Sequence, residues 1–371
     1  MSAEGRGKLK IYMGYAAGVG KTYAMLEESQ ELRARGVDVV VGYFEAHGRK
    51  DTIAKAEGLE IIPRKKVEYR GSVFEEMDTD AILARQPRVC AVDEFPHTNV
   101  PGSKRAKRCE DVLVLLDAGM DVLTTMNIQH LESLNDQVFE FTGIRVRETI
   151  LDWVVEQADE VVMVDLPPRA LLNRLDRGVV YGREKAQRAL ENFFRESTLV
   201  ALRELALRQT AHEVEHRAVT EDAGARKDGG SAGPAQARDK ILVLITSDPE
   251  TAMLIRRARR VCDFVGAESL AVAVRSPGDR NGSAEEREAI ERHLNFARNL
   301  RIETRIVEGD SVAETVVDFA HRNKVTQIFL ARPSERRWRI PLTRDPVQNI
   351  VALARDIQIV IVSPRNPAAA R

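Results

Sequence analysis

Residues 14–22, GYAAGVGKT, constrain this chain more than any other stretch because they can form a phosphate-binding turn. They follow a short apolar run, residues 9–13 (LKIYM), and lead into residues 23–28, which have the composition of a helix. Strand, glycine-rich turn, Lys-Thr and helix follow one another in this order in a P-loop. The sequence therefore predicts that this turn binds the phosphates of a nucleotide.

The glycines of the turn indicate which groups would hold the phosphates. They free the backbone to curl, so that its N–H groups and the positive end of the following helix face the phosphate oxygens. Lys21 would reach the β- and γ-phosphates, and the Thr22 hydroxyl would be a ligand of Mg²⁺. The residues expected to bind ATP in this turn are Gly14, Ala17, Gly18, Val19, Gly20, Lys21 and Thr22.

The turn departs from the strict pattern G-x-x-x-x-G-K-[ST] at one position. Tyr15 stands where the first glycine belongs, and Gly14 lies one residue earlier. The alternative interpretation is an ordinary glycine-rich turn between a strand and a helix. The Lys-Thr pair and the flanking segments favour phosphate binding.

The composition is that of an ordinary globular protein and excludes several classes. With 371 residues, 43% hydrophobic and 30% charged, the chain would form two or three domains. Its net charge of −1 gives no reason to expect a nucleic-acid partner. Three scattered cysteines favour a reducing compartment over a disulfide framework. Without a signal core or a run of ~18 apolar residues, we expect a cytoplasmic chain with no membrane span.

Strand-like and helix-like segments alternate along the first half, which predicts an α/β domain with a P-loop NTPase-like parallel sheet. Residues 37–44 (VDVVVGYF) are apolar enough to be a strand buried on both faces. Further strands are expected at residues 9–13, 59–62, 88–92, 121–126 and 161–165, and helices at 21–35, 78–85, 112–118, 169–176 and 184–207.

Two carboxylates, Asp93 and Glu94, follow the apolar strand at residues 88–92. In P-loop NTPases an aspartate at such a position holds Mg²⁺, in a strand close to that of the P-loop. Glu94 would then polarise an attacking water, which makes it the candidate catalytic residue. The alternative is a buried strand followed by an acidic turn.

Polar residues also follow the strand at residues 121–126. Asn127 or Gln129 could sense a γ-phosphate, because the carboxyl ends of parallel strands meet at one edge of a sheet. A plain turn at the entry of a helix explains these residues almost as well.

The composition changes in the second half of the chain. Residues 221–238 are rich in glycine, alanine and serine and have no apolar period, which is typical of a linker. Beyond them, five strands alternate with helices. We expect a nucleotide-binding sensor domain at 1–217, a flexible linker at 218–238 and a smaller five-stranded α/β domain at 239–371.

Three other motifs have a functional and an ordinary interpretation. Residues 212–216 (HEVEH) match a zinc-protease pattern, but they end a helix and lack a third ligand, so a solvated helix end is simpler. Residues 103–108 (SKRAKR) could contact phosphates or a partner subunit, or form a solvated loop. Residues 332–339, with Trp338, could bind a nucleotide or an acidic partner, or be ordinary surface.

The first half resembles the N-terminal cytoplasmic region of the KdpD potassium-sensing histidine kinases. The matching stretches are GVGKTYAML (18–26), VVVGYFEAHGRKDT (39–52), VDEFPHTNVPGSKR (92–105), TTMNIQHLESLND (124–136), GIRVRETI (143–150), VDLPP (164–168) and LVALRELALR (199–208). In that family the glycine before the loop also lies one position early. The resemblance implies an ATP-binding P-loop domain that belongs to a two-component system.

Residues from about 238 to 365 resemble the universal-stress-protein-like domain that follows in the same family. The resemblance implies universal stress proteins or a cyclic dinucleotide as partners of this domain. The nucleotide motif of stress proteins would begin at Ala331, where Ser334 replaces its second glycine and no Gly-Ser or Gly-Thr follows. The serine-rich turn that binds the cyclic dinucleotide in some relatives corresponds in part to residues 246–248 (TSD).

Full-length relatives are anchored in the inner membrane and continue into a phosphoacceptor helix and a kinase domain. Because the chain stops at Arg371, we expect a truncated or natural short form that cannot run the phosphorelay alone. We predict a cytoplasmic ATP·Mg²⁺-binding sensory module that acts on a histidine kinase or response regulator in the potassium or osmotic stress response. The alternatives are a free-standing P-loop ATPase or kinase, weak ATPase activity included, and a stress-protein-type scaffold with structural ATP.

Overall fold

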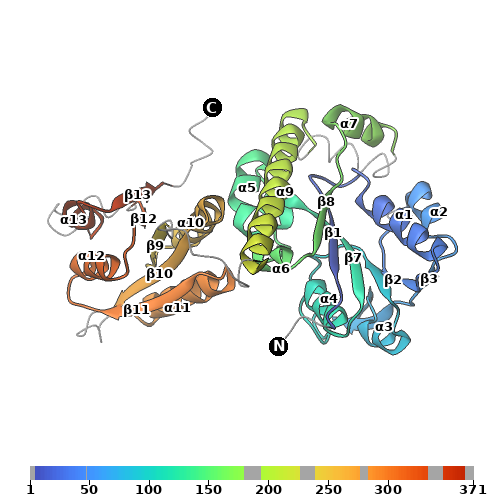
Figure 1. Cartoon of the computed structure of the whole chain (residues 1–371), viewed down its shortest axis with the longest axis horizontal. Coiled ribbons are helices and arrows are strands. Elements are labelled where there is room, and N and C mark those ends of the chain that lie inside the picture. The colour runs from blue at the N-terminus through green and yellow to red at the C-terminus, as the bar shows by residue number, and fades with distance from the viewer. Residues whose placement is uncertain are drawn as a thin grey trace. The chain divides into compact units, whose positions relative to one another are not determined.

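The computed structural model describes residues 5–46, 48–178, 194–225, 239–275, 283–332 and 346–363 (Figure 1). The chain divides into two compact units, residues 1–227 and 228–371. Each unit contains a parallel sheet with helices packed on it, so the expected α/β class is confirmed. Helix α9 (Glu196–Ala225) extends into the predicted linker, whose remaining residues lie outside the described ranges.

Six parallel strands form the sheet of the first unit, in the order β3-β2-β6-β7-β1-β8. Their bounds are β1 (Leu9–Gly14), β2 (Val39–Tyr43), β3 (Glu60–Ile61), β6 (Val89–Val92), β7 (Asp121–Asn127) and β8 (Glu160–Met163). Every residue of β2 and β6 is buried, as expected of strands that are covered on both faces. Because all six strands run in the same direction, their carboxyl ends form one edge of the sheet.

Helices cover both faces of this sheet. They are α1 (Lys21–Ala34), α2 (Lys50–Ala56), α3 (Thr79–Arg85), α4 (Arg108–Asp117), α5 (Asn135–Thr142), α6 (Asp152–Glu156), α7 (Pro168–Asp176) and α9. Successive residues of β1 point to opposite faces, so Tyr12 packs with Met25 and Leu26 of α1, whereas Ile11 and Met13 belong to a separate cluster with α4 and α9. Strand β1, which precedes the predicted P-loop, is therefore fixed from both sides.

An antiparallel hairpin, β4 (Lys65–Tyr69) and β5 (Ser72–Glu76), was not predicted from the sequence. Its turn places Arg70 at φ 50° and Gly71 at φ 76°, which suits a tight two-residue hairpin connection. Most of its residues are exposed, so its strands carry little of the apolar signal on which the prediction of strands relies.

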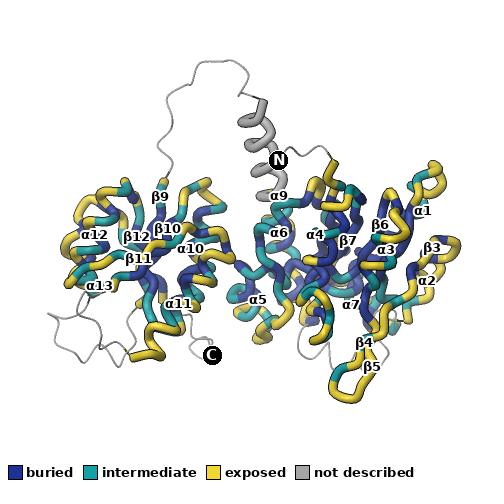
Figure 2. Tube along the Cα trace, turned by 90° about the horizontal axis from the view of Figure 1, so that it is seen from below, coloured by how far each residue is buried: buried dark blue, intermediate teal, exposed yellow. Residues whose placement is uncertain are grey.

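The second unit contains five parallel strands, as the sequence predicts, and their order in the sheet is β11-β10-β9-β12-β13. The strands are β9 (Lys240–Leu244), β10 (Glu268–Arg275), β11 (Glu303–Glu308), β12 (Gln327–Ala331) and β13 (Gln358–Val362). The helices are α10 (Thr251–Val265), α11 (Ala284–Asn299), α12 (Val312–Arg322) and α13 (Pro346–Leu353). Figure 2 shows buried residues concentrated in the central strands, with exposed residues on the outer turns of the helices.

Among the residues whose structure is described, no helix combines the length and the apolar composition that crossing a bilayer requires.

Candidate functional site

The predicted phosphate-binding turn connects the end of β1 to the start of α1. Gly18 and Gly20 have φ values of 91° and 111°, which residues with a side chain rarely adopt. A Cβ atom on Gly14 would lie 2.6 Å from Cγ2 of Val19, so only glycine leaves room for the turn to fold back over β1. These three glycines are therefore required by the shape of the turn.

Main-chain N–H groups at the start of α1 are available to bind an anion. The N–H of Ala24 donates to the carbonyl of Gly20 at 2.9 Å, and this bond begins the helical ladder. The N–H groups of Lys21 and Thr22 precede it, at the positive end of the helix dipole. This arrangement suits a phosphate group.

Tyr15, which breaks the strict motif, is a core residue. Its side chain is fully buried, and its hydroxyl donates to the carbonyl of Leu166 at 2.6 Å. Burial raises its pKa to about 12, so it remains a neutral hydrogen-bond donor. Tyr15 stands where the strict P-loop motif has its first glycine, and here it anchors the turn to the segment between β8 and α7.

Lys21 is buried and lies beside Asn127, the last residue of β7. Its Nζ donates to Oδ1 of Asn127 at 2.5 Å and to the carbonyl of Ala16 at 3.2 Å. Desolvation lowers the pKa of Lys21 to about 8, although the carboxylates of Glu94 and Asp93 oppose this effect. The structure thus brings together the predicted phosphate ligand and the predicted γ-phosphate sensor.

Asp93 is buried directly after β6 and accepts hydrogen bonds from three segments. The Thr22 hydroxyl lies 3.1 Å from both carboxylate oxygens, the Glu45 N–H donates at 3.2 Å, and the Thr125 hydroxyl donates to Oδ1. Desolvation, and then the charge of Glu94, raise the pKa of Asp93. A hydroxyl and a carboxylate are hard oxygen ligands, so Thr22 and Asp93 fit a Mg²⁺ ion. Strand β7 separates β6 from β1, so the two predicted Mg²⁺ ligands do not come from adjacent strands.

The peptide that joins Asp93 to Glu94 is held on both sides. Glu94 has φ 58°, an uncommon value for a residue other than glycine, and its N–H donates to the Thr125 hydroxyl at 3.2 Å. On the other side, Nη1 of Arg108 donates to the carbonyl of Asp93 at 3.2 Å. These contacts fix the direction in which the chain leaves β6.

Arg108 is the last residue of the basic stretch 103–108, and it is buried instead of lying in a solvated loop. Its guanidinium lies 3.7 Å from the centre of the Tyr43 ring and 3.3 Å from Oε2 of Glu76, at the end of the hairpin. The other basic side chains of the stretch also have partners in the first unit: Lys104 pairs with Asp80, Arg105 with Asp111, and Lys107 donates to the carbonyl of Thr149. Of this stretch, Arg108 therefore braces the site from inside.

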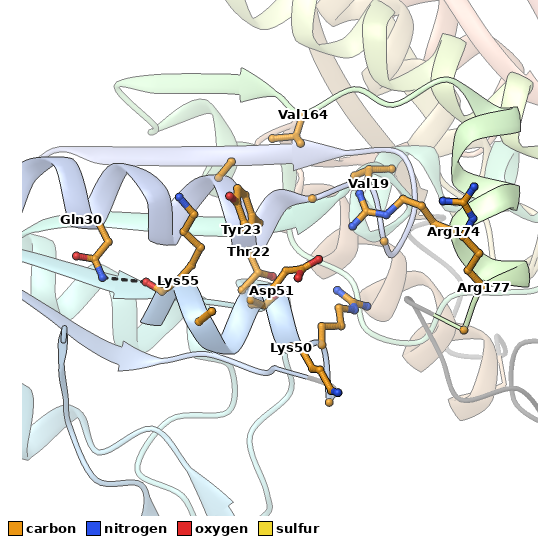
Figure 3. A pocket seen from close by; sticks show the side chains of 18 residues that line it. Val19, Thr22, Tyr23, Gln30, Lys50, Asp51, Lys55, Val164, Arg174 and Arg177 are labelled. Carbon is orange, nitrogen blue, oxygen red and sulfur yellow. Dashed lines mark hydrogen bonds between the residues drawn. The ribbon is translucent and has the colours of Figure 1, made fainter. Parts of the chain in front are cut away.

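A cavity of about 1320 Å³ opens beside the turn and is lined by residues from α1, α2 and α7 (Figure 3). Gly18, Val19, Gly20 and Thr22 are part of its wall. Five basic residues of the wall were not among the predicted site residues: Arg49, Lys50, Lys55, Arg174 and Arg177. A usable signal for the first two was their position after β2, at the edge where ligands of α/β sheets collect.

Two of the remaining motifs lie outside the part of the chain whose side chains are described. Residues 212–216 fall within α9, but their side chains lie outside the described residues, as does the basic segment beyond Arg332, including Ser334 and Trp338. The turn at residues 246–248 is tied to the following helix, since the Thr246 hydroxyl bonds the hydroxyl of Thr251, the first residue of α10, at 2.9 Å. A cyclic dinucleotide at this turn stays a prediction.

Comparison with known proteins identifies the family of the first unit. The family described as "KdpD: Osmosensitive K+ channel His kinase sensor domain" matches residues 5–214. This match covers more than half of the chain, so the chain belongs to the KdpD family.

Curated relatives carry the name of this family. The chain is 44% identical to the sensor protein KdpD of Escherichia coli (strain K12) over 99% of its own length and 40% of that protein. It is 39% identical to a putative sensor protein KdpD of Synechocystis sp., covering 96% of this chain and 94% of that one. The chain thus spans about two fifths of the length of the Escherichia coli relative.

Solved universal stress proteins are similar to part of the chain. One, in complex with cAMP, is 17% identical and covers 35% of this chain and 100% of its own, with a TM-score of 0.29. Another, from Burkholderia pseudomallei, is 19% identical, covers 36% and 100%, and has a TM-score of 0.28.

Replacing Arg108 with alanine should destabilise the first unit strongly. The change leaves the Glu76 carboxylate and the Asp93 carbonyl buried without their cationic partner, which costs about 3–5 kcal/mol. Urea unfolding of the two proteins measures this difference. The matched control is Lys104→Ala, because that pair with Asp80 is exposed and should contribute at most about 1 kcal/mol. Equal losses in the two variants would contradict the bracing role of Arg108.

The lowered pKa of Lys21 predicts how stability depends on pH. Since the folded value of about 8 lies below the ordinary 10.5, the charged lysine opposes folding below pH 8, and this cost disappears as the pH rises toward 10.5. Between pH 7 and pH 10 the wild type should therefore gain roughly 2–3 kcal/mol of unfolding free energy relative to Lys21→Met. Denaturant unfolding at both pH values measures the gain, and parallel pH profiles would contradict it.

Proposed function

We propose that the first unit binds ATP·Mg²⁺ at residues 14–22 and serves as a sensory module of a two-component system that responds to potassium or osmotic stress. The observation that carries this proposal is the convergence of Lys21, Thr22, Asp93 and Asn127 beside the turn. These are the residue types that a nucleoside triphosphate and its metal require, and they come from the start of α1 and the ends of two strands, β6 and β7.

Each of these residues has a role in the proposed site. The N–H groups from Gly18 to Thr22 and the Lys21 ammonium would hold the phosphates, while Thr22 and Asp93 would hold Mg²⁺. When bound, the metal would neutralise part of the phosphate charge. Lys21 would exchange its bond with Asn127 for bonds with phosphate oxygens, and because phosphates favour the charged lysine, binding would take up a proton near pH 8.

The released Asn127 offers a way to transmit occupancy. It is followed directly by a short 3-10 helix, η1 (Ile128–His130), in which Nδ1 of His130 lies 2.7 Å from the carbonyl of Glu148. A change at the end of β7 would therefore reach residues 128–150. We propose that a histidine kinase or a response regulator reads this change, and that universal stress proteins or a cyclic dinucleotide act on the second unit.

Lys21→Ala should lower the affinity for ATP·Mg²⁺ roughly 10- to 100-fold, because the variant loses a charged hydrogen bond to phosphate. Calorimetric titration of the whole chain measures this loss. Lys104→Ala removes a lysine whose partner Asp80 lies apart from the turn, and it should bind as the wild type does. If Lys21→Ala binds ATP·Mg²⁺ as tightly as the wild type does, the nucleotide does not bind at residues 14–22.

The second candidate function is ATP hydrolysis, and the position of Glu94 favours it. Glu94 follows the Mg²⁺ ligand, and its charge acts on Lys21, so it lies near the phosphates in the proposed site. The held peptide before it would aim its carboxylate at a water. If the chain is an ATPase, Glu94→Gln should lower turnover about 100-fold or more while ATP still binds. Equal and negligible turnover in both proteins would favour the purely regulatory role.

A further inference from the structure

Two arginines, Arg174 of α7 and Arg177 directly after this helix, face the proposed nucleotide site from the side opposite to Asn127. Arg174 and Arg177 are three residues apart, which places them on one face of the helix. Both line the cavity, and Figure 3 shows them extending from α7 on the side where Val19 of the turn lies. Since β8, which leads into α7, and β7, which ends at Asn127, both pair with β1, these two groups flank the turn.

The helix that precedes and carries these arginines, α7, is anchored in the core of the first unit. Leu171 and Leu175 on α7 are fully buried in the main core of the first unit, and α7 packs against α9. Its first residue is Pro168, directly after Pro167, so the helix starts at a defined point beyond β8. Side chains presented from such an anchored helix reach the same place in every molecule.

Nearby arginines form ion pairs with carboxylates, and in this they differ from Arg174 and Arg177. Arg169, earlier on α7, pairs with Glu196 at 2.9 Å, and Arg203 of α9 pairs with Asp165. Within the described ranges, neither Arg174 nor Arg177 forms an ion pair with a carboxylate. The described wall of the cavity contains five basic side chains and one acidic one, Asp51. Like charges that gather in one cavity repel one another, and an anion with several negative oxygens relieves that repulsion.

We propose that Arg174 and Arg177 bind the terminal phosphate of a nucleoside triphosphate, so that the site distinguishes a triphosphate from a diphosphate. The inference rests on the proposed function, because it assumes that the turn holds the inner phosphates. The terminal phosphate would then project past the turn toward the part of the cavity wall that Arg174 and Arg177 form. A guanidinium matches the oxygens of such a phosphate with two parallel hydrogen bonds, which an ammonium does not provide.

The test compares two ligands on the whole chain by calorimetry: Mg²⁺ with the non-hydrolysable β,γ-imido analogue of ATP, and Mg²⁺ with ADP. Arg174→Ala and Arg177→Ala should each bind the triphosphate analogue roughly tenfold more weakly and bind ADP almost as the wild type does. Arg174→Lys should show a similar loss, because it keeps the charge but not the paired hydrogen bonds.

The matched control is Arg169→Ala, which removes an arginine of the same helix whose side chain is 84% exposed and outside the cavity wall. It should bind both ligands as the wild type does. Thermal unfolding verifies that the variants fold, and their midpoints should match, since Arg177 is exposed and Arg174 half-buried.

Each outcome separates this inference from the proposed function. If the wild type binds neither ligand, the proposed function itself fails. If the wild type binds both and the variants bind as it does, or lose affinity for ADP and the analogue equally, the proposed function stands and the assignment of the terminal phosphate is overturned.

Discussion

At the carboxyl edge of the first sheet, the local structure is stable only if the buried carboxylate of Asp93 accepts hydrogen bonds from its neighbours. A carboxylate removed from water costs several kcal/mol unless donors replace the lost hydration. Thr22 at the start of α1, Thr125 on β7 and the Glu45 N–H after β2 are these donors. Because they belong to three separate segments, the same carboxylate ties the phosphate-binding turn to two strands that are distant in sequence. The local order of the site is therefore a requirement of stability, whether or not a ligand is bound.

A second layer of polar contacts lies behind Asp93. Arg108 bonds the carbonyl of Asp93 and pairs with Glu76, which also accepts the N–H of Val100 at 2.9 Å. Glu76 ends the exposed hairpin, so a movement of the hairpin and a change at the metal ligand would act on the same guanidinium. Nε of Arg108 is buried without a hydrogen-bond partner among the described residues, so this network is only partly satisfied.

The sequence predicted the parts of this site that are encoded locally. The apolar runs of β1, β6 and β7 and the Gly-Lys-Thr turn are continuous patterns, and the structure places Lys21, Thr22, Asp93 and Asn127 together as those patterns suggest. Arg108 was expected in a loop because its neighbours are basic, and its burial depends on Tyr43 and Glu76, far away in the chain. Arg174 was not predicted for the same reason. The sequence of α7 does not indicate that the face of this helix that carries Arg174 lies beside the turn after β1.

In the proposed nucleotide site, the amide oxygen of Asn127 would compete with phosphate for Lys21, because it already accepts a hydrogen bond from this ammonium. The affinity for phosphate would then be the difference between two bonds to the same ammonium. Such a site would bind the nucleotide more weakly than the number of its ligands suggests. The strength of the Lys21–Asn127 contact would set the nucleotide concentration at which the site fills. A sensor needs a threshold close to the concentration it reports, and an internal competitor provides that adjustment without altering the groups that touch the nucleotide.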